Sequence, residues 1–191
     1  MNPHLAQFVN ATIKESDALV NSFIKKKCFP DLLATGYFPN IKEVTESAAC
    51  VYAAYRHLGL DRSDPNVHVV VIGDGHQPRT GAMFAYTSRW RVTSVDPQMR
   101  NPGPDPQVKR LYCVRDRVQD VRFLSPVTQV AVLPHAHGTV ADAMEACPGA
   151  AIVSLQCCIP HVHPDGRKPD VEFEERGCKA PERTIRIWRN P

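Results

Sequence analysis

The sequence predicts an α/β fold: a doubly wound, mostly parallel sheet with a C-terminal antiparallel hairpin and two extra N-terminal helices. A β-branched run, Val67–Ile72, is typical of a central strand that is covered on both faces. Strand-like and helix-like segments then alternate as far as residue 158, which favours parallel strands joined by crossovers. In the tail, Val171 and Phe173 alternate with acids, and Ile185 and Ile187 flank an arginine. This last pattern indicates an antiparallel pair.

The composition is that of one globular domain. The chain has 191 residues, of which 43% are hydrophobic and 23% are charged, and this length suits one domain better than two. We therefore expect a single Rossmann-like domain over residues 1–191, with a helical appendage over residues 1–60 and a sheet core over residues 67–191.

The location and the partners are predicted from the same composition. No apolar run approaches the roughly 20 residues of a membrane helix, and the first residues do not resemble a signal peptide. The seven cysteines are scattered and odd in number, which indicates reduced thiols. We therefore expect a cytoplasmic protein with no membrane partner, while the formal charge of +3 permits an anionic ligand without requiring one.

Two amphipathic helices precede the predicted sheet. Apolar residues follow helical spacing over residues 3–24, and three lysines close that segment. Asn40 and Glu43 form a plausible capping box for a second helix, which Gly59 ends.

The core is divided by glycine and proline signals. Residues 73–78 form a turn after the first strand, and Pro78 fits the first position of a helix that runs to about residue 87. Residues 102–106 are rich in proline and indicate a loop. The expected strands are Val67–Ile72, 90–95, Leu111–Val114, 127–133 and 150–158, with a further helix over residues 139–147.

Ligands of such a sheet bind beyond the carboxyl ends of its strands, where the strand order reverses. Gly73 and Gly75 follow the first strand and let the backbone approach a ligand closely, although a glycine turn that merely reverses the chain is the alternative. Asp96 ends the second strand, where a ribose-binding acid is expected. Arg79 and Thr80 begin the next helix and are candidates to bind a carboxylate or phosphate; a surface arginine is the alternative there.

Three motifs resemble those of the class I S-adenosylmethionine-dependent methyltransferases. Val69-Val70-Val71-Ile72-Gly73-Asp74-Gly75 is similar to that family's first strand and glycine-rich loop, Val92-Thr93-Ser94-Val95-Asp96 to its second strand, and Arg115-Asp116 to its adenine-binding acid. The resemblance covers about residues 67–188 and implies a methyl-transfer enzyme with S-adenosylmethionine as cofactor. The residues expected to hold that cofactor are Gly73, Asp74, Gly75, Arg79, Thr80, Asp96, Asp116 and Pro134.

The chain departs from this family at two places. Val71 stands where the family usually has an acid, and His76 and Gln77 replace a small residue. After the fourth strand the sequence reads Leu133-Pro134-His135-Ala136-His137-Gly138, in place of an Asn or Asp with two prolines and an aromatic. The resemblance therefore does not imply amine methylation, and it leaves a catalytically silent binding or assembly module as an alternative.

Histidines and cysteines gather after the fourth and fifth strands. We predict that His135 lines the substrate pocket and acts as a general base; a simple polar loop residue is the alternative. Zinc is a further hypothesis, but neighbouring strand residues point to opposite faces, and Pro160 interrupts the series. We therefore expect no metal at this cluster, whose other members are His137, Cys157, Cys158, His161 and His163.

Two other ligand classes remain open. A nicotinamide dehydrogenase ranks lower, because Pro78 replaces the third glycine of its phosphate-binding motif. A nucleotide- or nucleic-acid-binding protein would use a basic rim. The residues of that rim would be Arg79, Arg89, Arg91, Arg100, Lys109 and Arg110, which could equally be a solvated face.

Overall fold

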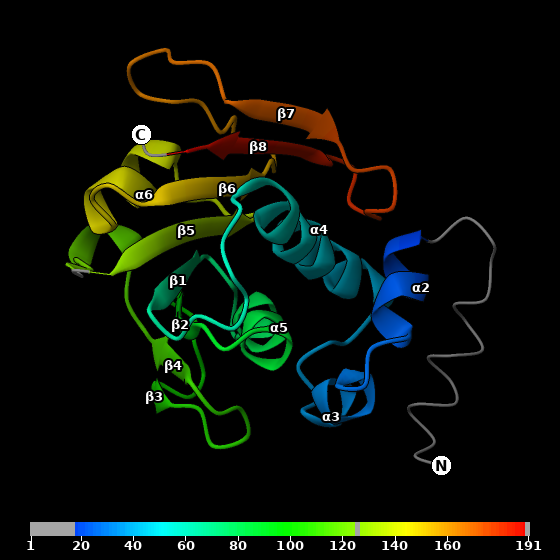
Figure 1. The fold of residues 1–191 in the computed structure, drawn as a ribbon. Helices are drawn as coiled ribbons and strands as arrows, with labels where there is room; N and C mark the ends of the chain where they lie inside the picture. The colour runs from blue at the N-terminus through cyan, green and yellow to red at the C-terminus, as the bar shows by residue number, and fades with distance from the viewer. Residues whose placement is uncertain (1–17, 125–126, 190–191) are drawn as a thin grey trace.

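The computed structural model describes residues 18–124 and 127–189, which form an eight-stranded sheet covered by helices (Figure 1). The strand order is β3-β4-β2-β1-β5-β6-β8-β7. The strands are β1 (Val67–Ile72), β2 (Arg91–Val95), β3 (Gly103–Pro104), β4 (Leu111–Val114), β5 (Thr128–Pro134), β6 (Ala151–Leu155), β7 (Val171–Glu174) and β8 (Thr184–Trp188).

The central strands β4, β2, β1, β5 and β6 are parallel, whereas β3, β8 and β7 each pair antiparallel to a neighbour. The predicted sheet and its C-terminal hairpin are thus confirmed. The strand order reverses between β1 and β5: the chain first continues from β1 to β2 and β4 on one side, and it then returns to form β5 and β6 on the other side. This reversal opens a crevice at the carboxyl ends of β1, β2 and β5.

Helices cover both faces of the sheet, because alternate residues of each central strand point to opposite sides. On one face, Val69 and Val71 of β1 belong to a buried cluster with α4 (Ile41–His57) and α5 (Arg79–Thr87). On the other face, Val70 and Ile72 pack with α6 (Val140–Ala146). The remaining helical elements are α2 (Ala18–Ile24), α3 (Phe29–Ala34) and the short 3-10 helix η1 (Val118–Asp120).

The N-terminal helices differ from the expected appendage. Helix α4 lies directly on the sheet, and its buried side is made of small residues such as Ala48, Ala49 and Ala53. Small side chains let a helix approach a sheet closely, so α4 is a core element. The predicted helix over residues 3–24 corresponds in part to α2, and its residues 3–17 lie outside the described residues.

Side-chain caps mark the start of helices α4 and α6. The Asn40 side chain accepts a hydrogen bond from the Glu43 backbone N–H at 3.1 Å, and Thr139 and Asp142 form a full capping box at α6. Helix α3 was not predicted, and it contains Pro30 near its start. Proline is tolerated in the first turn of a helix, and Pro30 lies there.

Candidate functional site

Two cavities meet at the crevice. The large cavity has a volume of about 460 Å³ and the small cavity about 180 Å³, and Gly73 and His135 line both. The carboxyl ends of β1, β2 and β5 and the segment after β4 surround the large cavity, whereas α4, the β1–α5 loop and the end of β5 surround the small one. This is the position at which the strand order predicts a ligand.

The loop after β1 needs glycine at two positions. Gly73 has φ +72°, and a Cβ atom there would lie 2.6 Å from Cβ of Ala136. Gly75 has φ +79°, and its backbone N–H donates to Oδ2 of Asp96 at 2.9 Å. The structure therefore brings together Gly73, Gly75 and Asp96, which the sequence places on two different strand ends.

Asp96 is half-buried and lines the large cavity. Its Oδ2 accepts from Gly75, and its Oδ1 accepts from the Gln98 backbone N–H at 2.7 Å. A carboxylate oxygen can accept more than one hydrogen bond. Both oxygens therefore remain able to accept hydrogen bonds from a ligand.

Asp74 is held inside the protein. Its buried carboxylate accepts hydrogen bonds from the backbone N–H groups of Thr80 and Gly81, both at 2.9 Å, and from Ser94 Oγ at 2.8 Å. Burial raises the pKa of Asp74, and these hydrogen bonds oppose that rise. The side chain therefore stabilises the start of α5. Only the backbone of Asp74 can then face a ligand.

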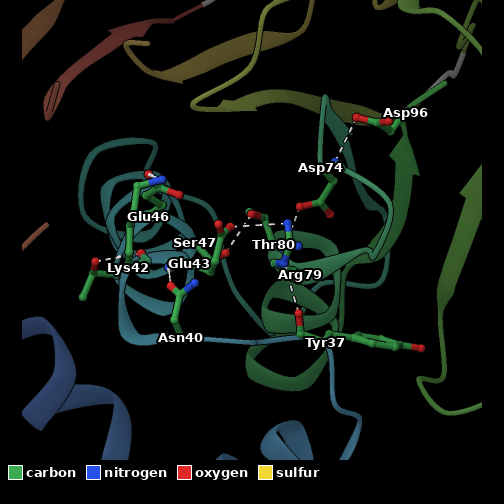
Figure 2. Close-up of polar contacts among 12 residues, drawn as sticks. Tyr37, Asn40, Lys42, Glu43, Glu46, Ser47, Asp74, Arg79, Thr80 and Asp96 are labelled. Atoms are coloured by element: carbon green, nitrogen blue, oxygen red, sulfur yellow. Dashed lines mark hydrogen bonds and ion pairs between the residues drawn. The ribbon is translucent and has the colours of Figure 1, made fainter. Parts of the chain in front are cut away.

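Arg79 and Thr80 line the small cavity and are tied to neighbouring segments (Figure 2). The Arg79 Nε donates to the Tyr37 backbone oxygen at 3.0 Å, and its guanidinium lies 3.3 Å from Oε2 of Glu43. Only 13% of the Arg79 side chain is exposed, so it is not a surface arginine. The Thr80 hydroxyl lies 2.9 Å from that of Ser47.

The sequence analysis missed the contribution of α4 to this site. Lys42, Glu43, Glu46 and Ser47 line the small cavity from the first turns of that helix (Figure 2). The Lys42 Nζ lies 3.0 Å from Oε1 of Glu46, whose side chain is 7% exposed, and the hydrogen bond from Lys42 to Glu46 raises the Lys42 pKa. The i,i+4 spacing of Lys42 and Glu46 was a signal in the sequence, but it is equally typical of an exposed helix face.

His135 adopts a left-handed backbone conformation between the two cavities, with φ 58°. Non-glycine residues in this conformation occur often at functional sites. The ring Nδ1 lies 2.9 Å from the Gln156 backbone oxygen. Because a carbonyl oxygen can only accept, Nδ1 carries the hydrogen, and Nε2 of the neutral ring is left with its lone pair.

Of the two remaining residues expected to bind the cofactor, Pro134 lies at the site and Asp116 lies outside it. Pro134 is the last residue of β5 and lines the small cavity. Asp116 is exposed, accepts from the Arg117 backbone N–H at 2.9 Å, and lines neither of the two cavities. The segment after β4 reaches the large cavity through Arg117, Val118 and Gln119 instead.

The geometric reason for expecting no metal at the histidine and cysteine cluster was wrong. Strand β6 ends at Leu155, so Cys157 and Cys158 lie in a loop and not on alternating strand faces. Candidate ligand atoms of His137, Cys157 and Cys158 all lie within 4.8 Å of one another.

The proposed basic rim is not continuous. Arg91 lies at the amino end of β2, whereas Arg79 begins α5, which follows the carboxyl end of β1. The two arginines therefore lie at opposite ends of the parallel strands. The Arg110 guanidinium donates to the backbone oxygens of Ala85 and Ser88 at 2.6 and 3.0 Å, so it is engaged within the protein.

Among the helices of residues 18–124 and 127–189, none has the length and apolar character needed to cross a membrane.

No protein-family model matches the sequence, and no curated protein matches it either. Several solved structures share its fold, and two structures of MtNAS are among them. One is a mutant of a nicotianamine synthase, MtNAS, in complex with S-adenosylmethionine: it is 13% identical with a TM-score of 0.53, over 97% of this chain and 76% of that one. The other is MtNAS in complex with MTA and tNA, which is 14% identical with a TM-score of 0.53, over 97% and 74% of the two chains. These likenesses show that the chain shares the α/β fold of MtNAS, which agrees with the observed sheet.

Proposed function

We propose that the chain binds S-adenosylmethionine across the two cavities and transfers its methyl group to an acceptor of unknown identity. The observation that carries the proposal is the meeting of Asp96 and Gly75 at the reversal of strand order, beside a second cavity lined by charged groups. The two MtNAS structures support the choice of cofactor, because one is a complex with S-adenosylmethionine.

The large cavity is proposed to hold the adenosine part. Asp96 would accept hydrogen bonds from the ribose hydroxyls through the unused lone pairs of its two oxygens. Val118 and Gln119 line the same cavity from the segment after β4, and they offer an apolar surface and a hydrogen-bonding group for the adenine. Asp116 has no part in this arrangement, because its carboxylate is exposed outside the cavity.

The small cavity is proposed to hold the amino-acid part. It is lined by two cations, Lys42 and Arg79, and two carboxylates, Glu43 and Glu46. A ligand that carries both an ammonium and a carboxylate complements such a set, because each of its charges finds an opposite charge. The methionine part of S-adenosylmethionine is a ligand of this kind.

His135 is proposed as the general base. When bound, S-adenosylmethionine would supply an electrophilic methyl group. The hydrogen bond from Nδ1 to Gln156 fixes the ring so that Nε2 can take the proton that the acceptor loses as it gains the methyl group. His135 lines both cavities, which suits a group that acts where the two parts of the cofactor join.

Calorimetry on the full chain tests the proposal with two ligands that differ in one part. S-adenosylmethionine carries the amino-acid part, and methylthioadenosine lacks it. We expect both to bind, and we expect Glu46→Gln to weaken S-adenosylmethionine binding while leaving methylthioadenosine binding unchanged. A nicotinamide dinucleotide and a short RNA serve as negative controls.

Each outcome has a definite meaning. If neither adenosine ligand binds, the proposed function is wrong, and binding of the dinucleotide or the RNA instead would favour one of the other ligand classes. If Glu46→Gln weakens both ligands equally, the small cavity does not hold the amino-acid part. Binding without methyl transfer to any acceptor class would favour the silent binding module.

A further inference from the structure

A compact group of sulfur and nitrogen atoms lies beside the large cavity, which one residue of the group, His137, lines. Strands β5 and β6 are parallel neighbours, with Pro134 paired to Leu155 at their ends. The loop after β5 carries His137, and the loop after β6 carries Cys157 and Cys158, so both loops leave the same edge of the sheet. His137 Nε2 lies 3.5 Å from Cys158 Sγ, and the ligand atoms of all three residues lie within 4.8 Å of one another.

The separation of His137 Nε2 and Cys158 Sγ suits two ligand atoms of one metal ion. Zinc binds thiolate sulfur at about 2.3 Å and imidazole nitrogen at about 2.0–2.1 Å, so tetrahedral ligand atoms are separated by about 3.3–3.8 Å. The separation of 3.5 Å between His137 Nε2 and Cys158 Sγ falls in that range. Two thiolates also balance the charge of a divalent cation, and sulfur with imidazole is a donor set that zinc prefers.

Neighbouring contacts fix the loop that would carry the ion. The buried Cys157 Sγ lies 2.9 Å from the backbone oxygen of Ala136, and His161 Nε2 lies 3.0 Å from the same oxygen. When Cys157 loses its proton to bind a metal, His161 can still donate to this oxygen. The loop after β5 would therefore keep a hydrogen bond in both states.

We propose that His137, Cys157 and Cys158 bind one zinc ion, with a fourth coordination position that is open. The buried Cys157 anchors the site inside the protein, whereas His137 and Cys158 are exposed and allow the ion to enter. His137 also lines the large cavity, so the ion would lie at its rim. Three protein ligands with one open position distinguish such a site from a closed structural one.

Cobalt titration tests this proposal on the full chain, purified without a polyhistidine tag and kept reduced with a phosphine. Co²⁺ replaces Zn²⁺ in thiolate sites, and it gives a sulfur-to-metal charge-transfer band and the visible bands of tetrahedral coordination. We expect these bands to saturate at one equivalent and to disappear when Zn²⁺ is added. In Cys158→Ser and in His137→Ala the apparent affinity should fall by about tenfold or more.

The matched control is Cys28→Ser, which removes a partly exposed thiol outside the cluster and should leave the titration unchanged. Cys158 is exposed, so its replacement leaves the fold intact, as circular dichroism can verify. The proposal is overturned if the wild type gives no charge-transfer band, or if Cys158→Ser binds cobalt as tightly as Cys28→Ser does. The readout does not depend on S-adenosylmethionine, so it is separate from the test of the proposed function.

Discussion

Replacing Gly73 with alanine tests the contact between the loops after β1 and β5. The new Cβ atom would lie 2.6 Å from Cβ of Ala136 and 3.3 Å from its Cα, at a backbone φ of +72°. The left-handed conformation costs an L-residue about 1–2 kcal/mol, and forcing an extra methyl group into a filled space costs about 1–3 kcal/mol. We therefore expect the free energy of unfolding to fall by about 2–5 kcal/mol.

Two comparisons separate these contributions. Gly149 has a similar φ of +75° with nothing within 4 Å of its added Cβ, so Gly149→Ala carries the conformational cost alone, about 1–2 kcal/mol. Adding Ala136→Gly to Gly73→Ala removes the contact between the two Cβ atoms. The double variant should therefore be more stable than the sum of the two single changes predicts.

Urea unfolding followed by circular dichroism measures all four variants. Gly73 and Ala136 both line the large cavity, so Gly73→Ala should weaken S-adenosylmethionine binding as well. The reasoning is refuted if Gly73→Ala costs no more than Gly149→Ala, or if Ala136→Gly gives no rescue.

Three further variants test the site and the core. Asp96→Ala should weaken S-adenosylmethionine binding by about 1–3 kcal/mol, because hydrogen bonds to a charged group are lost. Asp116→Ala is its control in calorimetry, and equal affinities in the two variants would remove Asp96 from the site. His135→Ala should abolish methyl transfer while the affinity for S-adenosylmethionine survives; loss of affinity would assign His135 to cofactor binding. Burial lowers the pKa of His68, whose Nε2 lies 2.9 Å from Thr93 Oγ1. The unfolded chain therefore binds this proton first as the pH falls below the ordinary value of 6.5, and stability declines from there to the folded pKa by at most about 1.4 kcal/mol per pH unit. His68→Gln should lose that part of the slope in urea unfolding at a series of pH values, and an unchanged slope would contradict the assignment.

The sheet was predictable because its central strands are buried on both faces. The β-branched run gave the bounds of β1, and β4 begins and ends where the sequence predicts. Strand β6 ends three residues earlier than expected, at Leu155. Its partner β5 ends at Pro134, and the left-handed His135 then turns the chain away, so pairing stops although the next residues still look strand-like.

The candidate site was less predictable, because it depends on contacts between distant segments. Gly75 and Asp96 could be placed together from the strand-end rule alone. The direction of the Asp74 side chain could not, since it follows from donors on Thr80, Gly81 and Ser94. The wall that α4 supplies was missed for a similar reason: helical spacing shows which side of a helix is apolar, but it does not show where the helix lies.

The placement of α4 couples ligand binding in the small cavity to the docking of this helix on the sheet. Its first turns line the small cavity, while its small residues pack on the sheet. A ligand held in that cavity would bridge the N-terminal part of the chain and the β1–α5 loop, so occupancy of the cavity and docking of the helix stabilise each other. Amide hydrogens along α4 should therefore exchange with solvent more slowly when the cavity is filled.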